Sequence, residues 1–208
     1  MLTTLPNLLT FSRIVAIPLV VITFYVPPPY GPWIGCALFA LAGFTDWLDG
    51  QLARMWKQQS ELGRFLDPIA DKLLVVAVLF MLGALQLRER QPPGTLALTI
   101  LYLLPALVII SREILVSGLR EYLAGLRVRL PVSRLAKWKT AIQMGAIGVL
   151  LVGDAGPSFL PLILIGELML WAAAVLTIIT GYDYLRAGLS HINDEEPAVK
   201  AAKPSSVA

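Results

Sequence analysis

The stretch TDWLDGQLARMWKQQSELGRFLDPIADK, residues 45–72, decides how the rest of the chain must be arranged. It places four carboxylates, those of Asp46, Asp49, Asp67 and Asp71, between two long apolar runs. A charged side chain at the centre of a bilayer costs about 2.5–3.5 kcal/mol on insertion scales, so these carboxylates need compensating partners. On helices, the i, i+3 spacing of the first pair and the i, i+4 spacing of the second each put two carboxylates on one face.

Two such faces turned toward one another form an oxygen-rich cage. Hard cations such as Mg²⁺ prefer oxygen ligands, and two ions roughly 3.5–4 Å apart support displacement at phosphorus. Gly50 leaves the backbone open to a close ligand, and Arg54, one turn further on, is placed to reach a phosphate. The stretch therefore predicts a two-metal site for chemistry at phosphorus. The alternative is a set of interfacial carboxylates solvated in a loop.

The pattern D-x2-D-G-x2-A-R-x8-G-x3-D-x3-D runs from Asp46 to Asp71. It resembles, without a mismatch, the signature of the CDP-alcohol phosphotransferases. The resemblance implies an all-α integral membrane protein in which the four carboxylates hold two divalent cations, Mg²⁺ or Mn²⁺. It also implies that Asp71 is the general base, that Gly50 and Ala53 make room for the cytidine, and that Arg54 pairs with the diphosphate.

The composition outside this stretch is that of a membrane protein. Of the 208 residues, 57% are hydrophobic and 15% charged, and the mean hydropathy is +0.72. A span needs about 20 predominantly apolar residues. Runs of this kind predict about six transmembrane helices in one domain, near residues 9–27, 32–49, 68–87, 96–119, 135–153 and 159–185. We predict that this membrane domain fills residues 1–188 and that residues 189–208 form a disordered cytoplasmic tail.

The net charge of +3 and the pI near 9.1 follow from topology, so no nucleic-acid partner is expected. Basic residues gather in the loops between the second and third runs and between the fourth and fifth, whereas the opposite loops hold only Arg88 and Arg90. By the positive-inside rule, both termini and the carboxylate cage lie on the cytoplasmic side, facing anionic lipid headgroups. Cys36 is the single cysteine, so no disulfide can form within one chain.

A polar stripe enters the membrane on the first run, where Asn7, Thr10 and Arg13 recur at i, i+3 and i+6. Polar side chains at that depth need polar partners. In the family that the chain resembles, this segment lies beside the nucleotide pocket, which implies that the three residues contact the cytidine diphosphate. The alternative is a stripe that caps the helix and anchors it at the interface.

A second polar stripe, which includes Arg112 and Arg120, occupies the latter half of the fourth run, and Lys137 and Lys139 open the fifth. Cations on adjacent helices beside a metal site form an anion pocket, so we predict that these four residues hold the phosphate of an acceptor substrate. The alternative is a cluster that binds lipid phosphate. We interpret Lys72, directly after the carboxylates, as snorkelling to the interface.

The segments SREILVSGLRE, residues 111–121, and PVSRLAKWKTAIQM, residues 131–144, resemble one branch of the family. Its members transfer a phosphatidyl group from CDP-diacylglycerol to sn-glycerol 3-phosphate, and the resemblance implies a homodimer in the bacterial inner membrane. Alternative acceptors are inositol phosphate and phosphatidylglycerol. A cation transporter is the alternative from another class, but it predicts paired inverted repeats, and the other half of the chain holds no second carboxylate cage.

Overall fold

The computed structural model describes residues 5–56, 61–89, 96–125 and 134–201, with side chains at most but not all of these positions. Helices joined by short turns make up all the regular secondary structure of this part of the chain, which confirms the all-α prediction. The elements are α1 (Leu5–Thr23), α2 (Tyr30–Trp56), α3 (Glu61–Glu89), α4 (Leu96–Gly125), α5 (Arg134–Val152), the short 3₁₀ turn η1 (Gly153–Ala155) and α6 (Leu162–Ala201).

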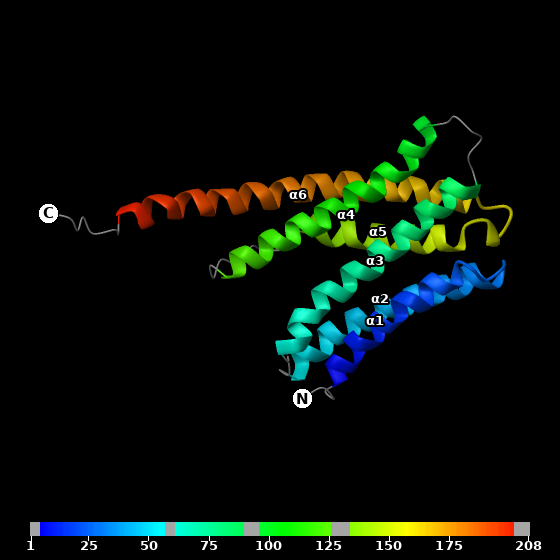
Figure 1. Cartoon of the computed structure of the whole chain (residues 1–208), viewed down its shortest axis with the longest axis horizontal. Coiled ribbons are helices and arrows are strands. Elements are labelled where there is room, and N and C mark those ends of the chain that lie inside the picture. Colours follow the sequence, from blue (N-terminus) through cyan, green and yellow to red (C-terminus); the bar gives the residue numbers. More distant parts are fainter. Residues whose placement is uncertain (1–4, 57–60, 90–95, 126–133, 202–208) are drawn as a thin grey trace.

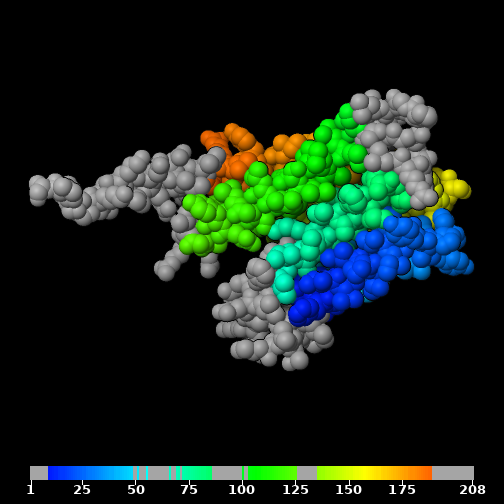
Figure 2. All heavy atoms as spheres, viewed as in Figure 1, coloured from blue at the N-terminus to red at the C-terminus, as the bar shows by residue number. Residues whose placement is uncertain are grey.

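Successive helices run in alternating directions, so the molecule has two distinct ends (Figure 1). One end gathers the starts of α1, α3 and α5 with the ends of α2, α4 and α6. Helix α1 packs on α2 and α3, while α5 packs on α6, and α4 bridges α3 and α6. Figure 2 shows α3 and α4 side by side across one face of the molecule. The signature stretch therefore lies at one end of the bundle, where α2 finishes and α3 begins.

Several helices continue past the bounds that hydrophobicity predicted. The end of α2 is Trp56 and the start of α3 is Glu61, so the eight fixed positions of the signature all stand on helical backbone. Helix α6 continues to Ala201, whereas a disordered tail was predicted from residue 189. The hydrophobic pattern measures only the apolar slab, and residues such as Ala, Glu and Lys favour continued helix in water.

Two described helical segments, Leu135–Ala155 and Leu162–Gly188, are long and apolar enough to cross a membrane. Two shorter apolar segments, Leu9–Thr23 and Lys72–Leu85, accompany them. Many large apolar side chains on the described helices face outward, among them Val15, Phe44 and Phe80. An outer surface of this kind is expected where lipid surrounds the helices.

Small and branched side chains fill the space between the helices. Val20, Val78, Ile109, Ala146 and Ala173 are each 0% exposed and come from α1, α3, α4, α5 and α6 in turn. Small residues let helix backbones approach closely, which is the usual basis of packing between membrane helices. The core thus fixes the helices on which the polar residues of the candidate site are mounted.

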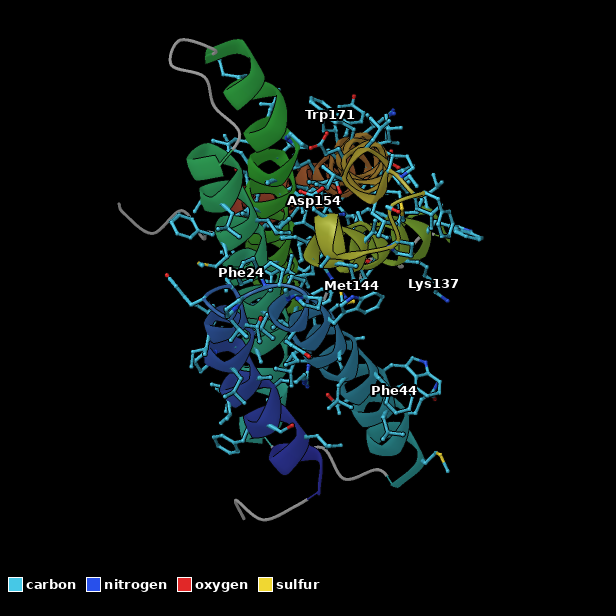
Figure 3. The ribbon with its side chains drawn as sticks, turned by 90° about the vertical axis from the view of Figure 1, so that its right-hand side faces the viewer. Phe24, Phe44, Lys137, Met144, Asp154 and Trp171 are labelled. Atoms are coloured by element: carbon cyan, nitrogen blue, oxygen red, sulfur yellow. The ribbon has the colours of Figure 1, made fainter. Side chains whose placement is uncertain are left out.

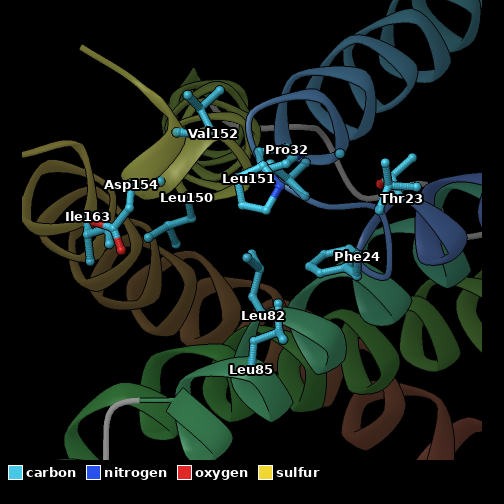
Figure 4. A pocket seen from close by; sticks show the side chains of 15 residues that line it. Thr23, Phe24, Pro32, Leu82, Leu85, Leu150, Leu151, Val152, Asp154 and Ile163 are labelled. Carbon is cyan, nitrogen blue, oxygen red and sulfur yellow. The ribbon is translucent and has the colours of Figure 1, made fainter. Parts of the chain in front are cut away.

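A cavity of about 230 Å³ opens at the end of the bundle opposite the signature (Figure 4). Its walls are mainly aliphatic and aromatic, with Phe24, Leu82 and Leu150 among them, and Asp154 stands at the rim. The indole N–H of Trp33 donates to the carbonyl of Ala155 at 3.2 Å and ties α2 to η1 beside it. Apolar walls of this kind do not bind charged phosphates, so the candidate functional site lies at the signature end of the bundle.

Candidate functional site

The signature residues occupy the last turns of α2 and the first turns of α3. Of the predicted metal ligands, the Asp46 side chain belongs to the described part of the chain. The side chains of the other predicted ligands, Asp49, Asp67 and Asp71, lie outside it. Those of the predicted donor-binding residues Asn7, Gly50, Ala53 and Arg54 lie outside it as well. Within the described residues no group of three His, Cys, Asp or Glu could hold a metal ion. The metal cage therefore stays a prediction.

Arg13 on α1 forms an ion pair with the Asp46 carboxylate on α2. The Arg13 side chain is 1% exposed, whereas that of Asp46 is 43% exposed. Thr10, one turn before Arg13, is also buried. The polar stripe of α1 thus faces the first carboxylate of the signature. Whether the stripe also contacts a nucleotide stays a prediction.

The donor set is chemically compatible with divalent cations. Asp46 and Asp49 lie at i, i+3 on α2, and Asp67 and Asp71 lie at i, i+4 on α3. Carboxylate oxygens are ligands that Mg²⁺ and Mn²⁺ prefer. Because the Asp46 carboxylate keeps much of its surface accessible beside Arg13, it can accept a further partner.

Arg112 turns from α4 toward α6. Its Nη2 donates to Thr180 Oγ1 at 3.1 Å, and its guanidinium carbon lies 5.6 Å from the centroid of the Tyr184 ring. Gly181 makes room for it, since a Cβ at that position would lie 3.0 Å from Arg112 Cγ. The guanidinium therefore joins α4 to α6 through a hydrogen bond and a cation–π contact.

Glu113, next along α4, accepts a hydrogen bond from Lys139 Nζ on α5. It also lies 3.5 Å from Arg112 Nη1. The side chains of Lys139 and Glu113 are 5% and 22% exposed. One carboxylate therefore balances two cations at the meeting point of α4, α5 and α6, which is how a buried charge becomes tolerable.

Lys72 donates from α3 to Ser117 Oγ on α4. The interpretation of Lys72 as a snorkelling side chain did not anticipate this contact, which is possible because α4 packs beside α3. A cavity of about 50 Å³ lies beyond this contact, and its polar lining includes Lys72, Glu113, Lys139 and Gln143.

The four cations predicted to hold an acceptor's phosphate occupy different surroundings. Arg112 contacts α6 and Lys139 contacts Glu113, as described above. Arg120 is exposed on α4. Lys137 is exposed as well and projects from α5 away from the neighbouring helices (Figure 3). Their common role stays a prediction, and the described geometry gathers only Arg112 and Lys139 around a shared carboxylate.

Sequence reasoning missed one polar residue of this region, Gln143, and it placed Glu113 and Ser117 on the polar stripe of the fourth run without giving either a role. A signal for them exists in helical spacing. Glu113 and Ser117 are four residues apart on α4, and Lys139 and Gln143 are four apart on α5, so each pair shares a face. Because both α4 and α5 belong to one bundle, the polar face of one helix indicates a contact with the polar face of the other.

Comparison with known proteins agrees with the signature. A model of the family described as CDP-alcohol phosphatidyltransferase matches residues 3–179. A Rickettsia bellii protein named CDP-diacylglycerol–glycerol-3-phosphate 3-phosphatidyltransferase is 47% identical over 183 residues, covering 88% of this chain and 94% of its own length. Proteins of the same name from Haemophilus influenzae and Cereibacter sphaeroides are 42% and 36% identical, covering 91% and 92% of this chain and 96% and 98% of their own lengths. The chain therefore belongs to the CDP-alcohol phosphatidyltransferase family.

Proposed function

We propose that the chain is a CDP-diacylglycerol–glycerol-3-phosphate 3-phosphatidyltransferase. The observation that carries the proposal is the likeness to proteins of this name, 36–47% identical over 88–92% of the chain. The complete signature on α2 and α3 supports the same class of reaction. Products of the reaction are phosphatidylglycerol phosphate and CMP, and the activity belongs to phospholipid biosynthesis.

The reaction is a displacement at phosphorus. The 1-hydroxyl oxygen of sn-glycerol 3-phosphate forms a bond to the phosphorus that carries diacylglycerol. The bond from that phosphorus to the oxygen bridging it to CMP breaks, and CMP leaves with the electron pair. Asp71 accepts the proton of the attacking hydroxyl, a role that contributes about 10²–10⁴ in rate when a general base performs it.

Asp46, Asp49, Asp67 and Asp71 would hold two divalent cations, Mg²⁺ or Mn²⁺. Such cations neutralise the diphosphate and the charge on the leaving group. Arg13 orients the Asp46 carboxylate from α1. Positioning of this kind by an outer partner typically contributes about 10–100-fold to metal affinity or activity.

The remaining predicted residues divide between the two substrates. Asn7, Thr10, Arg13, Gly50, Ala53 and Arg54 serve the cytidine diphosphate, and Arg112, Arg120, Lys137 and Lys139 serve the phosphate of the acceptor. The acyl chains of the donor remain among the lipids. We place the protein in the bacterial inner membrane as a homodimer, with residues 1–188 as its membrane domain and the signature end of the bundle facing the cytoplasm.

The test is an acceptor competition with purified protein. CDP-diacylglycerol is supplied with Mg²⁺ and with sn-glycerol 3-phosphate, inositol phosphate or phosphatidylglycerol, and CMP release and lipid products are measured. We expect metal-dependent formation of phosphatidylglycerol phosphate from the first acceptor alone. Preference for either of the others would overturn the assignment of acceptor but leave the family's reaction class intact.

A further inference from the structure

Gln143 on α5 is a buried amide with an unused hydrogen-bonding atom. The residue is 4% exposed, and its Oε1 has no hydrogen-bond partner among the described residues. A buried amide oxygen without a partner is destabilising, because it loses its hydrogen bonds to water. Such an atom therefore indicates that something outside the protein's own side chains completes it.

Gln143 lines the cavity of about 50 Å³ between α3, α4 and α5. A water needs about 10–15 Å³ of such space, so the cavity has room for more than one water-sized group. Met144, the next residue on α5, forms part of the same wall and packs its methyl group toward α2 at Gly43 (Figure 3). The cavity is therefore a built polar pocket, with one apolar side and one unsatisfied acceptor.

The chemistry of the pocket selects the kind of group that completes Gln143. An amide oxygen accepts hydrogen bonds, so its partner must carry an O–H or N–H donor. A phosphate dianion offers no donor. A cationic amine would be repelled by Lys72 and Lys139, which line the same pocket, and the Glu113 carboxylate there is already shared by Lys139 and Arg112. An alcohol satisfies the amide and is neutral toward the two lysines.

The pocket lies beside the predicted reaction centre. Its α3 wall begins with Lys72, the residue after Asp71, and includes Val75, which is one helical turn beyond Asp71. Its α5 wall contains Lys139, one turn before Gln143 and predicted to serve the acceptor's phosphate. An alcohol bound here stands between the residues assigned to the attacking hydroxyl and those assigned to the phosphate.

We propose that Gln143 accepts a hydrogen bond from the 2-hydroxyl of sn-glycerol 3-phosphate and is a specificity-determining residue for the acceptor. The 2-hydroxyl is the group between the attacking 1-hydroxyl and the phosphate, which matches the place of the pocket. This inference rests on the proposed function, because it assigns one atom of that function's acceptor to one side chain.

Two acceptors that differ only in this hydroxyl test the proposal, sn-glycerol 3-phosphate and 3-hydroxypropyl phosphate. We expect the purified wild-type protein to favour the first in kcat/KM by about tenfold or more, the factor that corresponds to one hydrogen bond of about 1.4 kcal/mol. Gln143→Met should remove most of this preference by raising the KM for sn-glycerol 3-phosphate, with little change for the analogue. Gln143→Glu keeps an accepting oxygen at the same reach and should restore part of it.

Thr177→Val is the matched control, because it removes a buried hydroxyl on α6 that has no hydrogen-bond partner among the described residues and lies outside this cavity, so it should keep the wild-type ratio. If Gln143→Met lowers kcat/KM equally for both acceptors, the amide holds only a water or a neighbouring helix and the proposal is overturned. Equal use of the two acceptors by the wild type overturns it without any variant. A wild-type protein that turns over neither acceptor contradicts the proposed function itself.

Discussion

Arg13 shows how a single residue prepares the signature before any substrate arrives. With 1% of the side chain exposed, its guanidinium needs an anion beside it. Asp46 supplies that anion from the neighbouring helix while keeping 43% of its own side chain exposed. The first carboxylate of the signature is therefore held by a buried arginine while part of its own surface stays exposed.

Arg13→Gln should lower metal-dependent turnover by about 10–100-fold, because the carboxylate loses the partner that orients it. In the same variant, the Mg²⁺ concentration needed for half-maximal activity should rise. A Mg²⁺ titration of turnover, with thermal unfolding in detergent as the check on folding, measures both. If only the KM for CDP-diacylglycerol changes while the metal requirement does not, Arg13 acts on the nucleotide and not through Asp46.

Asp71→Asn should lower kcat by about 10²–10⁴ while the affinity for CDP-diacylglycerol stays near the wild-type value, since a general base acts on the proton and not on the donor. Steady-state kinetics with both substrates varied separates the two effects. Calorimetric titration with metal in the presence of a CDP-alcohol supplies the control. Loss of one metal ion from the variant would identify Asp71 as chiefly a ligand.

Sequence reasoning at this scale identified chemistry better than partners. The spacing of the carboxylates and of the stripe on α1 predicted two polar faces, and the structure brings Arg13 against Asp46. It did not predict that Lys139 pairs with Glu113 or that Lys72 reaches Ser117. Those choices depend on which helices become neighbours, and helical periodicity within one segment carries no such information.

The contact of α4 with α6 depends on a small residue opposite a large cation. Gly181 lies against the Arg112 side chain, with an added Cβ 3.0 Å from Cγ and 3.5 Å from Nε. Thr180 and Tyr184, on either side of Gly181 along α6, provide the hydroxyl and the ring that hold the guanidinium. The three residues on α6 thus form one binding site for the Arg112 side chain.

Gly181→Val should destabilise the protein by roughly 1–3 kcal/mol, the usual effect of forcing extra carbons into a packed contact. Gly118→Val on α4 is the matched control, because a Cβ there meets nothing within 4 Å. Thermal unfolding of both variants in the same detergent compares them. Equal losses of stability in the two variants would mean that the Arg112 side chain moves aside at little cost and that helix propensity alone explains the change.

At the scale of elements, the order and number of the described helices were predictable, whereas their ends were not. Hydrophobic length predicted runs at 96–119 and 135–153, and the structure has α4 at Leu96–Gly125 and α5 at Arg134–Val152. The largest differences are at the end of α2, the start of α3 and the end of α6, where the helix continues beyond the apolar run. An apolar pattern indicates which residues contact lipid, whereas the backbone hydrogen bonds of a helix can continue beyond the apolar run. The ends of a helix therefore do not follow from the apolar pattern.

The whole molecule has two chemically unlike ends. The signature and both polar stripes gather at one end, and the largely apolar cavity near Asp154 lies at the other (Figure 1, Figure 4). From the positive-inside rule we predict that the signature end faces the cytoplasm. A water-soluble acceptor would then reach the signature without crossing the bilayer.

Single-cysteine variants test this orientation. In a Cys36→Ala background, Ser158→Cys in the turn before α6 should react with a membrane-impermeant maleimide in intact spheroplasts. Gly125→Cys at the end of α4 should react only after permeabilisation. Both positions are exposed, so access to the reagent depends on the side of the membrane. The reverse pattern would place the signature outside the cytoplasm.

The polar stripe of α4 has a consequence for how the chain is made. Arg112 and Glu113 find their partners Lys139, Thr180 and Tyr184 later in the chain. When α4 emerges from the ribosome, none of these residues has yet been synthesised, so Arg112 and Glu113 have only one another as charged partners among the residues named here. A charged side chain at the bilayer centre raises the free energy of insertion by about 2.5–3.5 kcal/mol. We therefore predict that α4 stays beside the translocon until α5 and α6 arrive and that the three helices complete their insertion as a group.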